Sequence, residues 1–259
     1  MPRAACDDAD MPVMPGAEPF TAEGGPVGAL LCHGFTGTPQ SLRPWAEHLA
    51  AAGLTVDLPR LAGHGTSWQE MNLTRWEDWY GTVDRALTRL TARCDEVFVM
   101  GLSMGGTLAI RLAEQRGGEI SGLVLVNPSL LTKRIDRHLL PVARLILPSR
   151  AGIASDIKKP DAAELGYNRI PVKAAYSLSK LWLQTRNDLD RVTQPILLFR
   201  STEDHVVEPD SCVRLHAAVK GEVREVLLEN SYHVATLDND AQTIFEGSLE
   251  FVRELSRVT

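Results

Sequence analysis

The sequence predicts an α/β fold in which a mostly parallel β-sheet is flanked by helices and carries one inserted segment. Two observations predict the sheet: short apolar runs alternate with amphipathic helical patterns, and those runs are rich in Val, Leu and Phe. A third observation predicts the insertion, because residues 128–189 contain several prolines but no run of the core-strand type. A chain of 259 residues with 44% hydrophobic residues can bury such a core.

The elements of the first half follow in order from these patterns. Thr38 and Pro39 are the N-cap and first position of a helix that ends before Gly53. Thr74 and Glu77 predict a capping box that opens a second, longer helix. The apolar runs between these helices predict strands at 27–32, 54–59 and 96–101.

The second half continues the alternation after a helix predicted at 104–115. Its apolar runs predict strands at 120–127, 195–201 and 223–229, and a last helix is predicted at 241–255. Residues 1–17 are rich in Pro, Gly and Asp and predict a flexible tail. The predicted organisation is therefore an α/β core at 18–127 and 190–259, with a cap or lid at 128–189.

Composition and charge exclude several classes of function. A net charge of −6 without a Lys/Arg cluster argues against a nucleic-acid partner. The first twenty residues lack the apolar centre of a signal peptide, and the apolar tract at 139–148 is too short for stable membrane insertion. Four scattered cysteines, with Cys32 and Cys94 expected to be buried, indicate reduced thiols and a cytoplasmic protein.

A serine lies where a predicted strand turns sharply into a helix. Gly101, Ser103 and Gly105 fit the pattern G-x-S-x-G, in which a strained turn raises the serine hydroxyl above the edge of the sheet. The glycines let the strand and the helix pass closely, and the N-terminus of the helix stabilises negative charge there. Ser103 is therefore the predicted nucleophile, and the alternative is a plain strand-to-helix turn.

A serine nucleophile needs a base and a group that orients the base. In this arrangement the acid and then the histidine follow later strands of the sheet. Asp204 comes directly after one predicted strand, with Glu203 and Glu208 as rival acids, and His233 follows the last strand. The alternatives are a solvated loop carboxylate and a structural loop histidine.

Two backbone N–H groups are predicted to stabilise the oxyanion that forms during acyl transfer. They belong to Met104, directly after the nucleophile, and to Phe35, in the glycine-containing loop after the first strand. His33 and His64 are interpreted as residues that hold loops in place. The sequence contains no metal, phosphate or dinucleotide motif, so no cofactor and no metal are expected.

Several tracts together resemble the α/β-hydrolase superfamily, and more narrowly the bacterial monoacylglycerol lipases and their carboxylesterase relatives. The resemblance implies the α/β-hydrolase fold with an inserted cap, and the same three catalytic residues. It also implies that Glu164, in PDAAELGY, hydrogen-bonds the glycerol head of a substrate, although a surface acid is an equal alternative. The tracts are LLCHGFTGTP (30–39), RLAGHGT (60–66), GLSMGGTLA (101–109), EDHVV (203–207) and NSYHVATLDND (230–240).

The predicted function is that of a serine hydrolase that cleaves small carboxylic esters, foremost monoacylglycerols, through an acyl-enzyme on Ser103. Leu139, Leu145 and Ile146 are predicted to line the acyl site, with burial in the core as the alternative. Three other functions remain open: a general short-chain carboxylesterase with the same triad, a peptidase of similar shape, and a non-catalytic ligand-binding protein. The sequence also leaves open the acyl length, cap movement and a homodimer.

Overall fold

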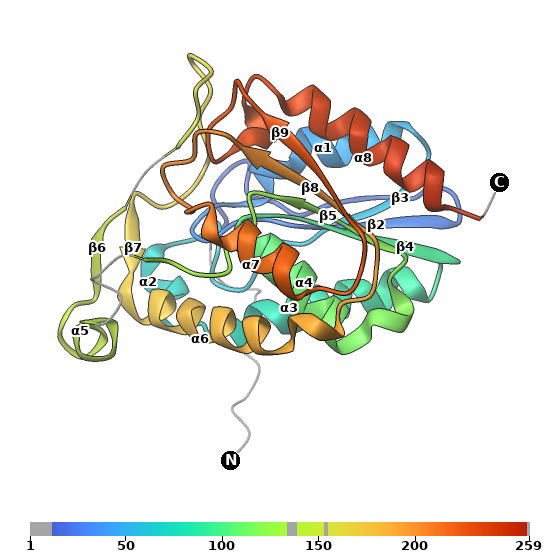
Figure 1. Ribbon diagram of the computed structural model, residues 1–259. Helices are drawn as coiled ribbons and strands as arrows, with labels where there is room; N and C mark the ends of the chain where they lie inside the picture. The colour runs from blue at the N-terminus through green and yellow to red at the C-terminus, as the bar shows by residue number, and fades with distance from the viewer. Residues whose placement is uncertain (1–11, 134–138, 153–154, 258–259) are drawn as a thin grey trace.

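The computed structural model describes residues 12–133, 139–152 and 155–257 (Figure 1). Its centre is a seven-stranded sheet in the order β1-β3-β2-β4-β5-β8-β9. Neighbouring strands are parallel except that β1 runs antiparallel to β3, which confirms the predicted mostly parallel sheet. The strands are Phe20–Ala22 (β1), Val27–Cys32 (β2), Thr55–Leu58 (β3), Glu96–Leu102 (β4), Gly122–Val126 (β5), Ile196–Ser201 (β8) and Val223–Leu228 (β9).

Helices cover both faces of this sheet (Figure 1). Helices α1 and α8 lie on one face, and α3, α4 and α6 lie on the other. The α-helices are Arg43–Ala51 (α1), Trp68–Met71 (α2), Trp76–Thr91 (α3), Met104–Arg116 (α4), Leu140–Ile146 (α5), Val172–Asp188 (α6), Asp210–Ala218 (α7) and Ala241–Leu255 (α8). Short 3₁₀ turns lie at Pro39–Leu42, Gly117–Glu119, Leu189–Arg191 and Ala235–Leu237.

The strand β2 shows how the sequence produces two cores. Its side chains alternate, so Leu30 and Cys32 pack with α3 and α4 while Ala29 and Leu31 pack with α1 and α8. A parallel sheet buried on both faces requires this continuous apolar run. The predicted burial of the thiols is confirmed, since Cys32 and Cys94 are free and buried.

The predicted capping box is wrong by one residue. The backbone N–H of Arg75 donates to Asp78 Oδ2 at 2.8 Å, so α3 begins one residue later than the pair Thr74 and Glu77 implied. The Thr74 hydroxyl instead accepts a hydrogen bond from Trp79 Nε1 at 2.9 Å. A buried indole N–H needs a partner, and this need competes with capping.

The predicted tail is packed against the fold wherever the structure describes it. Residues 1–11 lie outside the described residues, but the N–H of Met14 donates to the carbonyl of Gly65 at 2.8 Å. Ala17 is fully buried. Residues 12–17 are therefore part of the folded protein and not a loose extension.

The insertion is shorter than the predicted boundaries 128–189. Its C-terminal part is α6, which packs against α3 and α4 and adds Leu178 and Leu181 to the core beneath the sheet. The remainder contains α5 and two short antiparallel strands, Ser149–Ala151 (β6) and Arg169–Pro171 (β7), which the sequence did not predict. We call the described residues within 131–171 the cap segment; its elements α5, β6 and β7 lie at the left in Figure 1.

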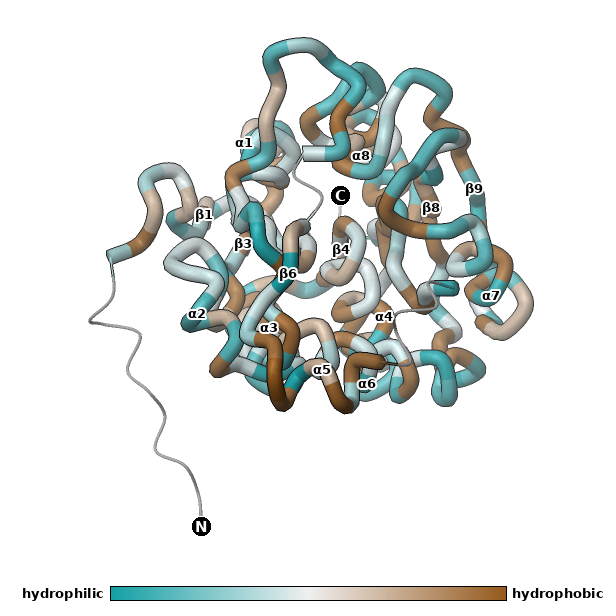
Figure 2. Tube along the Cα trace, turned by 90° about the vertical axis from the view of Figure 1, so that its left-hand side faces the viewer, coloured by the Kyte–Doolittle hydropathy of each residue, from teal (hydrophilic) through white to brown (hydrophobic). Residues whose placement is uncertain are grey.

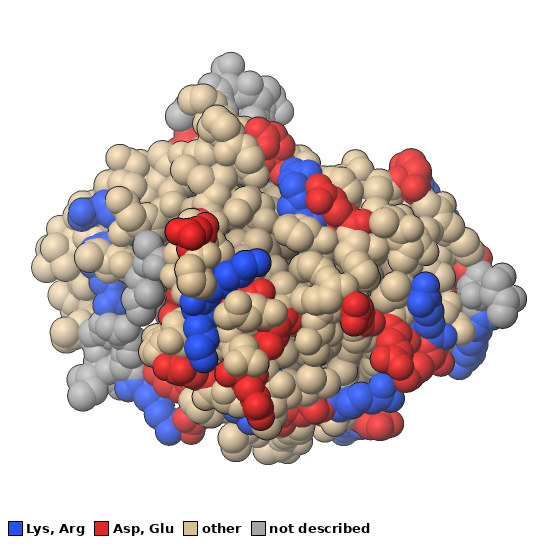
Figure 3. Space-filling model, turned by 90° about the horizontal axis from the view of Figure 1, so that it is seen from above, with Lys and Arg blue, Asp and Glu red and all other residues tan. Residues whose placement is uncertain are grey.

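The surface carries charges of both signs. On the face shown in Figure 3, acidic and basic side chains are interspersed and do not form a field of one sign. The described residues on this face form no basic stripe of the kind that a nucleic-acid backbone requires. Among the described residues, none of the helices is long and apolar enough to cross a lipid bilayer.

Candidate active site

Ser103 occupies the sharp turn between β4 and α4. Its backbone has φ 56° and ψ −118°, a conformation that costs energy for a residue with a side chain. Side chains at the two flanking glycines would not fit, because a Cβ at Gly101 would overlap Gly105 and a Cβ at Gly105 would overlap the carbonyl of Cys32. The backbone N–H of Ser103 donates to the Val126 carbonyl at 3.0 Å, which holds the turn against β5.

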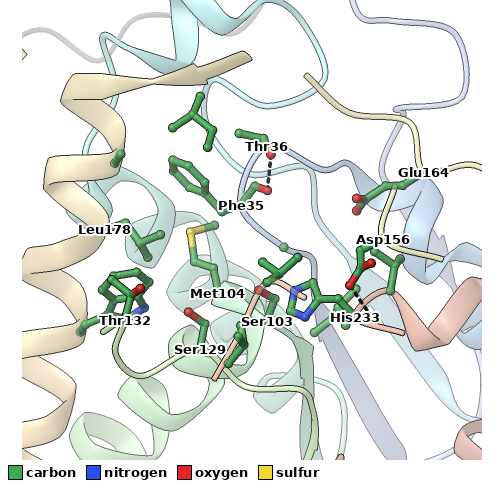
Figure 4. Close-up of a pocket in the computed structure, with 18 of the residues that line it drawn as sticks. Phe35, Thr36, Ser103, Met104, Ser129, Thr132, Asp156, Glu164, Leu178 and His233 are labelled. Atoms are coloured by element: carbon green, nitrogen blue, oxygen red, sulfur yellow. Dashed lines mark hydrogen bonds between the residues drawn. The ribbon is translucent and has the colours of Figure 1, made fainter. Parts of the chain in front are cut away.

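Asp204 and His233 follow β8 and β9, and their side chains meet. His233 Nδ1 donates to Asp204 Oδ2 at 2.8 Å. The other oxygen, Oδ1, accepts the N–H groups of Val206 and Val207, both at 2.8 Å, so both carboxylate oxygens are fixed. With its proton on Nδ1, the ring presents Nε2 as an acceptor. Figure 4 shows the His233 ring beside the Ser103 hydroxyl in one cavity.

Burial and pairing act in opposite directions on these two groups. Burial disfavours charge on His233, but the surrounding carboxylates, Asp204 foremost, together outweigh burial and raise the pKa of this histidine above its ordinary value. Burial likewise opposes the charge on Asp204, yet His233 and the two backbone N–H groups lower its pKa. The pair therefore favours a charged carboxylate that can stabilise an imidazolium.

The rival acids have other partners. Glu203 Oε1 faces His205 Nε2 at 3.4 Å, and its side chain is 53% exposed. Glu208 Oε1 accepts the backbone N–H of Lys133 at 3.0 Å. The structure thus brings only Asp204, of the three candidates, to His233.

Two residues that the sequence analysis missed fix the loop of His233. The Nδ2 of Asn127 donates to the His233 carbonyl at 2.9 Å, and its Oδ1 accepts the Ser201 N–H at 2.8 Å. The N–H of His233 donates to Asp156 Oδ2 in the cap segment at 3.2 Å. Asn127 carried a signal, since it is a polar residue directly after an apolar strand. Asp156 carried none, because its neighbours in sequence form no strand.

The predicted oxyanion donors belong to residues that line the same cavity as Ser103 (Figure 4). Met104 is the first residue of α4, where a backbone N–H has no partner within the helix. Phe35 lies in the loop after β2, followed by Thr36 with a positive φ of 64°. The Thr36 hydroxyl donates to the Phe35 carbonyl at 2.5 Å, on the peptide that follows the predicted donor N–H.

His33 and His64 lie beneath this loop, outside the cavity lining. His33 Nδ1 donates to the Gly34 carbonyl at 3.0 Å, and its Nε2 accepts the Leu61 N–H at 3.1 Å. Burial lowers the pKa of His33 to about 4 and that of His64 well below its usual range. Both are neutral at neutral pH and hold the loops, as interpreted from the sequence.

The cavity has a volume of about 240 Å³ and an apolar wall with a few polar groups. Loops at the strand ends, the cap segment and α6 all contribute to the wall. This combination is typical of a site for a small, mostly apolar ligand. The apolar residues include Leu140, Ile170, Leu178, Trp182, Val206 and Val207, and the polar residues include Thr36, Ser129, Thr132, Asp156 and Glu164.

Glu164 lies in the wall of the cavity that the cap segment forms. Its side chain is partly buried, and burial raises its pKa to about 7. A Cβ at Gly37 would overlap the Glu164 carboxylate, so the glycine makes room for it. The backbone N–H of Glu164 donates to Ser155 Oγ at 2.7 Å, which fixes the residue near Asp156 (Figure 4).

The prediction that Leu139, Leu145 and Ile146 line the acyl site is wrong, and so is the alternative that they are core residues. They are 66%, 75% and 72% exposed, and only Leu140 of this helix reaches the cavity. Helix α5 turns its apolar side chains outward, and Figure 2 shows apolar residues of α5 at the edge of the molecule. A helical apolar stripe shows which residues share a face but not what covers it.

Comparisons with known proteins add independent information. A family model described as serine aminopeptidase, S33, matches residues 28–240. A thermostable monoacylglycerol lipase from Bacillus sp. (strain H-257) is 47% identical over 93% of this chain and 96% of that protein. A carboxylesterase from Bacillus subtilis (strain 168) is 26% identical over 92% and 97%. A solved structure from work on the metagenome-derived lipolytic enzymes LipS and LipT matches with TM-score 0.91 and 41% identity, over 94% of this chain and 100% of that one.

Proposed function

The chain belongs to the serine aminopeptidase S33 family and has the α/β-hydrolase fold, and on this premise we propose that it hydrolyses monoacylglycerols to a fatty acid and glycerol. One observation carries the chemistry: a serine on a strained turn lies in a cavity beside a histidine whose Nδ1 is held by a buried carboxylate. The substrate class is supported by 47% identity to a monoacylglycerol lipase over nearly the whole chain.

The proposed reaction has two halves that share one base. Ser103 Oγ attacks the ester carbonyl carbon while His233 Nε2 takes its proton, and the N–H groups of Phe35 and Met104 stabilise the oxyanion. The bond between the acyl carbon and the glycerol oxygen then breaks, and His233 returns its proton to that oxygen. Water attacks the acyl-enzyme with His233 again as base, which releases the fatty acid and restores Ser103.

The cavity supports a substrate with one acyl chain and a small polar head. Its apolar wall and its volume of about 240 Å³ suit a single acyl chain. Glu164 is proposed to bind the glycerol hydroxyls. A carboxyl group whose pKa is near 7 accepts hydrogen bonds from a hydroxyl when ionised and donates one when protonated.

Replacing Glu164 by Gln is expected to lower kcat/KM for 1-lauroylglycerol while leaving p-nitrophenyl butyrate hydrolysis unchanged at pH values above the acidic limb, where His233 is neutral in both proteins. Hydrogen bonds to a charged group are about 1 kcal/mol stronger than those to a neutral one, which corresponds to a roughly fivefold loss. The loss should grow as the pH rises above the pKa of about 7, because only then does the wild-type residue carry the charge. Initial rates measured on both sides of this pH check the expectation.

The matched control is Asp161→Asn, which removes an exposed acid of the cap segment. An equal loss for both esters in Glu164→Gln would contradict the assigned role.

A panel of mono-, di- and triacylglycerols tests the substrate class, and trioleoylglycerol cleaved as fast as 1-lauroylglycerol would contradict it. The family is named for an aminopeptidase, so the panel includes an amino-acyl p-nitroanilide as a peptidase substrate. A profile that favours short alkyl esters would support a general carboxylesterase.

The exposed face of α5 is expected to contact aggregates of the substrate, since long-chain monoacylglycerols do not disperse as single molecules. Leu145→Glu and Ile146→Glu should each slow hydrolysis of emulsified 1-lauroylglycerol by about tenfold, because each removes a side chain worth about 1.5–3 kcal/mol of apolar burial. Hydrolysis of soluble p-nitrophenyl butyrate should not change. Val213→Glu on α7, where Val213 is 65% exposed, is the matched control. Equal losses on both substrates would contradict this expectation.

A homodimer and a cytoplasmic location stay predictions. Light scattering of the wild type and of Leu145→Glu tests the first, because a dimer that covers α5 would dissociate in the variant. The second is supported by the free, buried thiols of Cys32, Cys94 and Cys212, which suit a reducing compartment.

A further inference from the structure

Asp156 lies between the two loops that carry Asp204 and His233, although it belongs to neither. Its Oδ2 accepts the backbone N–H of His205 at 3.1 Å and the backbone N–H of His233 at 3.2 Å. Its Oδ1 accepts from His205 Nδ1 at 2.8 Å, and its carbonyl accepts the Val234 N–H at 3.1 Å. One carboxylate of the cap segment therefore joins the acid loop to the base loop.

The Asp156 carboxylate is largely shielded from solvent, which strengthens its hydrogen bonds. The Asp156 side chain is 9% exposed and lines the same cavity as Ser103 and His233. Hydrogen bonds from backbone N–H groups to a charged acceptor are stronger than neutral ones. An acceptor shared by two loops fixes the distance between them, whereas the bond between His233 and Asp204 alone fixes only the ring.

The cap segment is also attached to the core by contacts that do not involve Asp156. Asp238 accepts the N–H groups of Lys158 and Lys159 at 2.7 and 2.8 Å, and that of Tyr232 at 2.9 Å. Asp238 thus holds the cap segment at residues 158 and 159, and its side chain accepts no hydrogen bond from the backbone of His205 or His233. The contacts of Asp156 add something different, namely the spacing of the loops and a negative charge near the imidazole.

We propose that Asp156 is a positioning residue for the hydrolytic reaction, which sets the spacing of the Asp204 and His233 loops and stabilises the imidazolium that forms when Ser103 loses its proton. This inference rests on the proposed function. It assigns part of the cap segment to the catalytic apparatus, so that this segment does more than cover the substrate.

The charges around His233 are consistent with this role. After the opposing effect of burial, the carboxylates of Asp204, Glu164 and Asp156 each raise the pKa of His233. On its other side Asp156 faces His205, whose pKa it raises through their hydrogen bond. His205 in turn faces Glu203 at 3.4 Å, and Lys158 lies 4.0 Å from Glu203. Removing the charge of Asp156 therefore favours a neutral His233.

The test measures kcat, KM and the pH profile of kcat/KM for p-nitrophenyl butyrate, together with Tm. Asp156→Asn is expected to lower kcat roughly tenfold with little change in KM, because its amide oxygen can keep both backbone N–H bonds while the imidazolium of His233 loses a stabilising negative charge. The acidic limb of the profile should move to lower pH, because the activity requires a neutral His233 whose pKa has fallen. Asp156→Glu keeps the charge but not the spacing, so its kcat should fall while the limb stays in place.

Two control variants, Asp161→Asn and Asp238→Asn, and the reference variant Ser103→Ala separate a positioning role of Asp156 from a merely structural one. Asp161→Asn should change neither kcat nor the limb, and Asp238→Asn should lower Tm without moving the limb. Asp156→Asn with wild-type kcat and an unmoved limb overturns the proposal, as does a fall in kcat that only follows a lower Tm. If Asp156→Asn does not fold, Asp156→Glu decides, and a wild-type kcat there overturns the proposal. Ser103→Ala as active as the wild type would overturn the proposed function itself, whatever Asp156 does.

Discussion

Ser103→Ala is expected to lower kcat/KM for p-nitrophenyl butyrate by about 10⁶-fold, because it removes the atom that forms the acyl-enzyme. The substitution deletes one oxygen and leaves the flanking glycines and the hydrogen bond from residue 103 to Val126 in place, so Tm should hardly change. Stopped-flow measurement of the nitrophenolate burst checks the result directly. The wild type should show a burst equal to the enzyme concentration, and the variant should show none.

A serine-directed phosphonate gives a second measurement of the same prediction. Mass spectrometry should find the label on the peptide that contains Ser103. Ser248→Ala is a suitable control, since this buried serine on α8 bonds only its own helix at the Ile244 carbonyl. A burst that survives in Ser103→Ala, or a label on another residue, would contradict the role of Ser103. Binding of the ester without any turnover by the wild type would favour the non-catalytic alternative.

The three predicted catalytic residues, which the structure brings to one cavity, share a local signal. Ser103, Asp204 and His233 each come directly after a predicted strand, and parallel strands bring their carboxyl ends to one edge of the sheet. The sharp turn at Ser103 was recognisable from its glycines. They are required where two backbone segments pass closely, and this close passage involves only neighbouring elements of the sheet. Periodicity and strand order therefore gave most of the sheet and the place of these side chains.

The residues that the sequence missed or misplaced depend on packing between distant segments. Asp156 is 77 residues from His233, and nothing in its own neighbourhood indicates the loop that it contacts. The face of α5 was assigned inward because its apolar spacing is that of a buried helix, yet Leu145 is 75% exposed among the residues that the structure describes. Residues 12–17 have the composition of a tail, but Ala17 is fully buried and attaches them to the folded protein.

Asp204→Asn is expected to lower kcat by about 10⁴-fold, because it forces the wrong tautomer on His233. Asp204 Oδ1 accepts two backbone N–H groups, so an amide must keep its oxygen there and turn its NH₂ toward His233 Nδ1. The ring then accepts at Nδ1 and carries its proton on Nε2, where it cannot take the proton of Ser103. The raised pKa of His233 depends on the Asp204 carboxylate, so the remaining activity should have its acidic limb at lower pH than the wild type.

Glu203→Gln is the matched control, since this exposed carboxylate lies one residue away and was a rival in the sequence. A loss in Glu203→Gln as large as that in Asp204→Asn, or a limb that does not move in Asp204→Asn, would contradict the assignment of the acid.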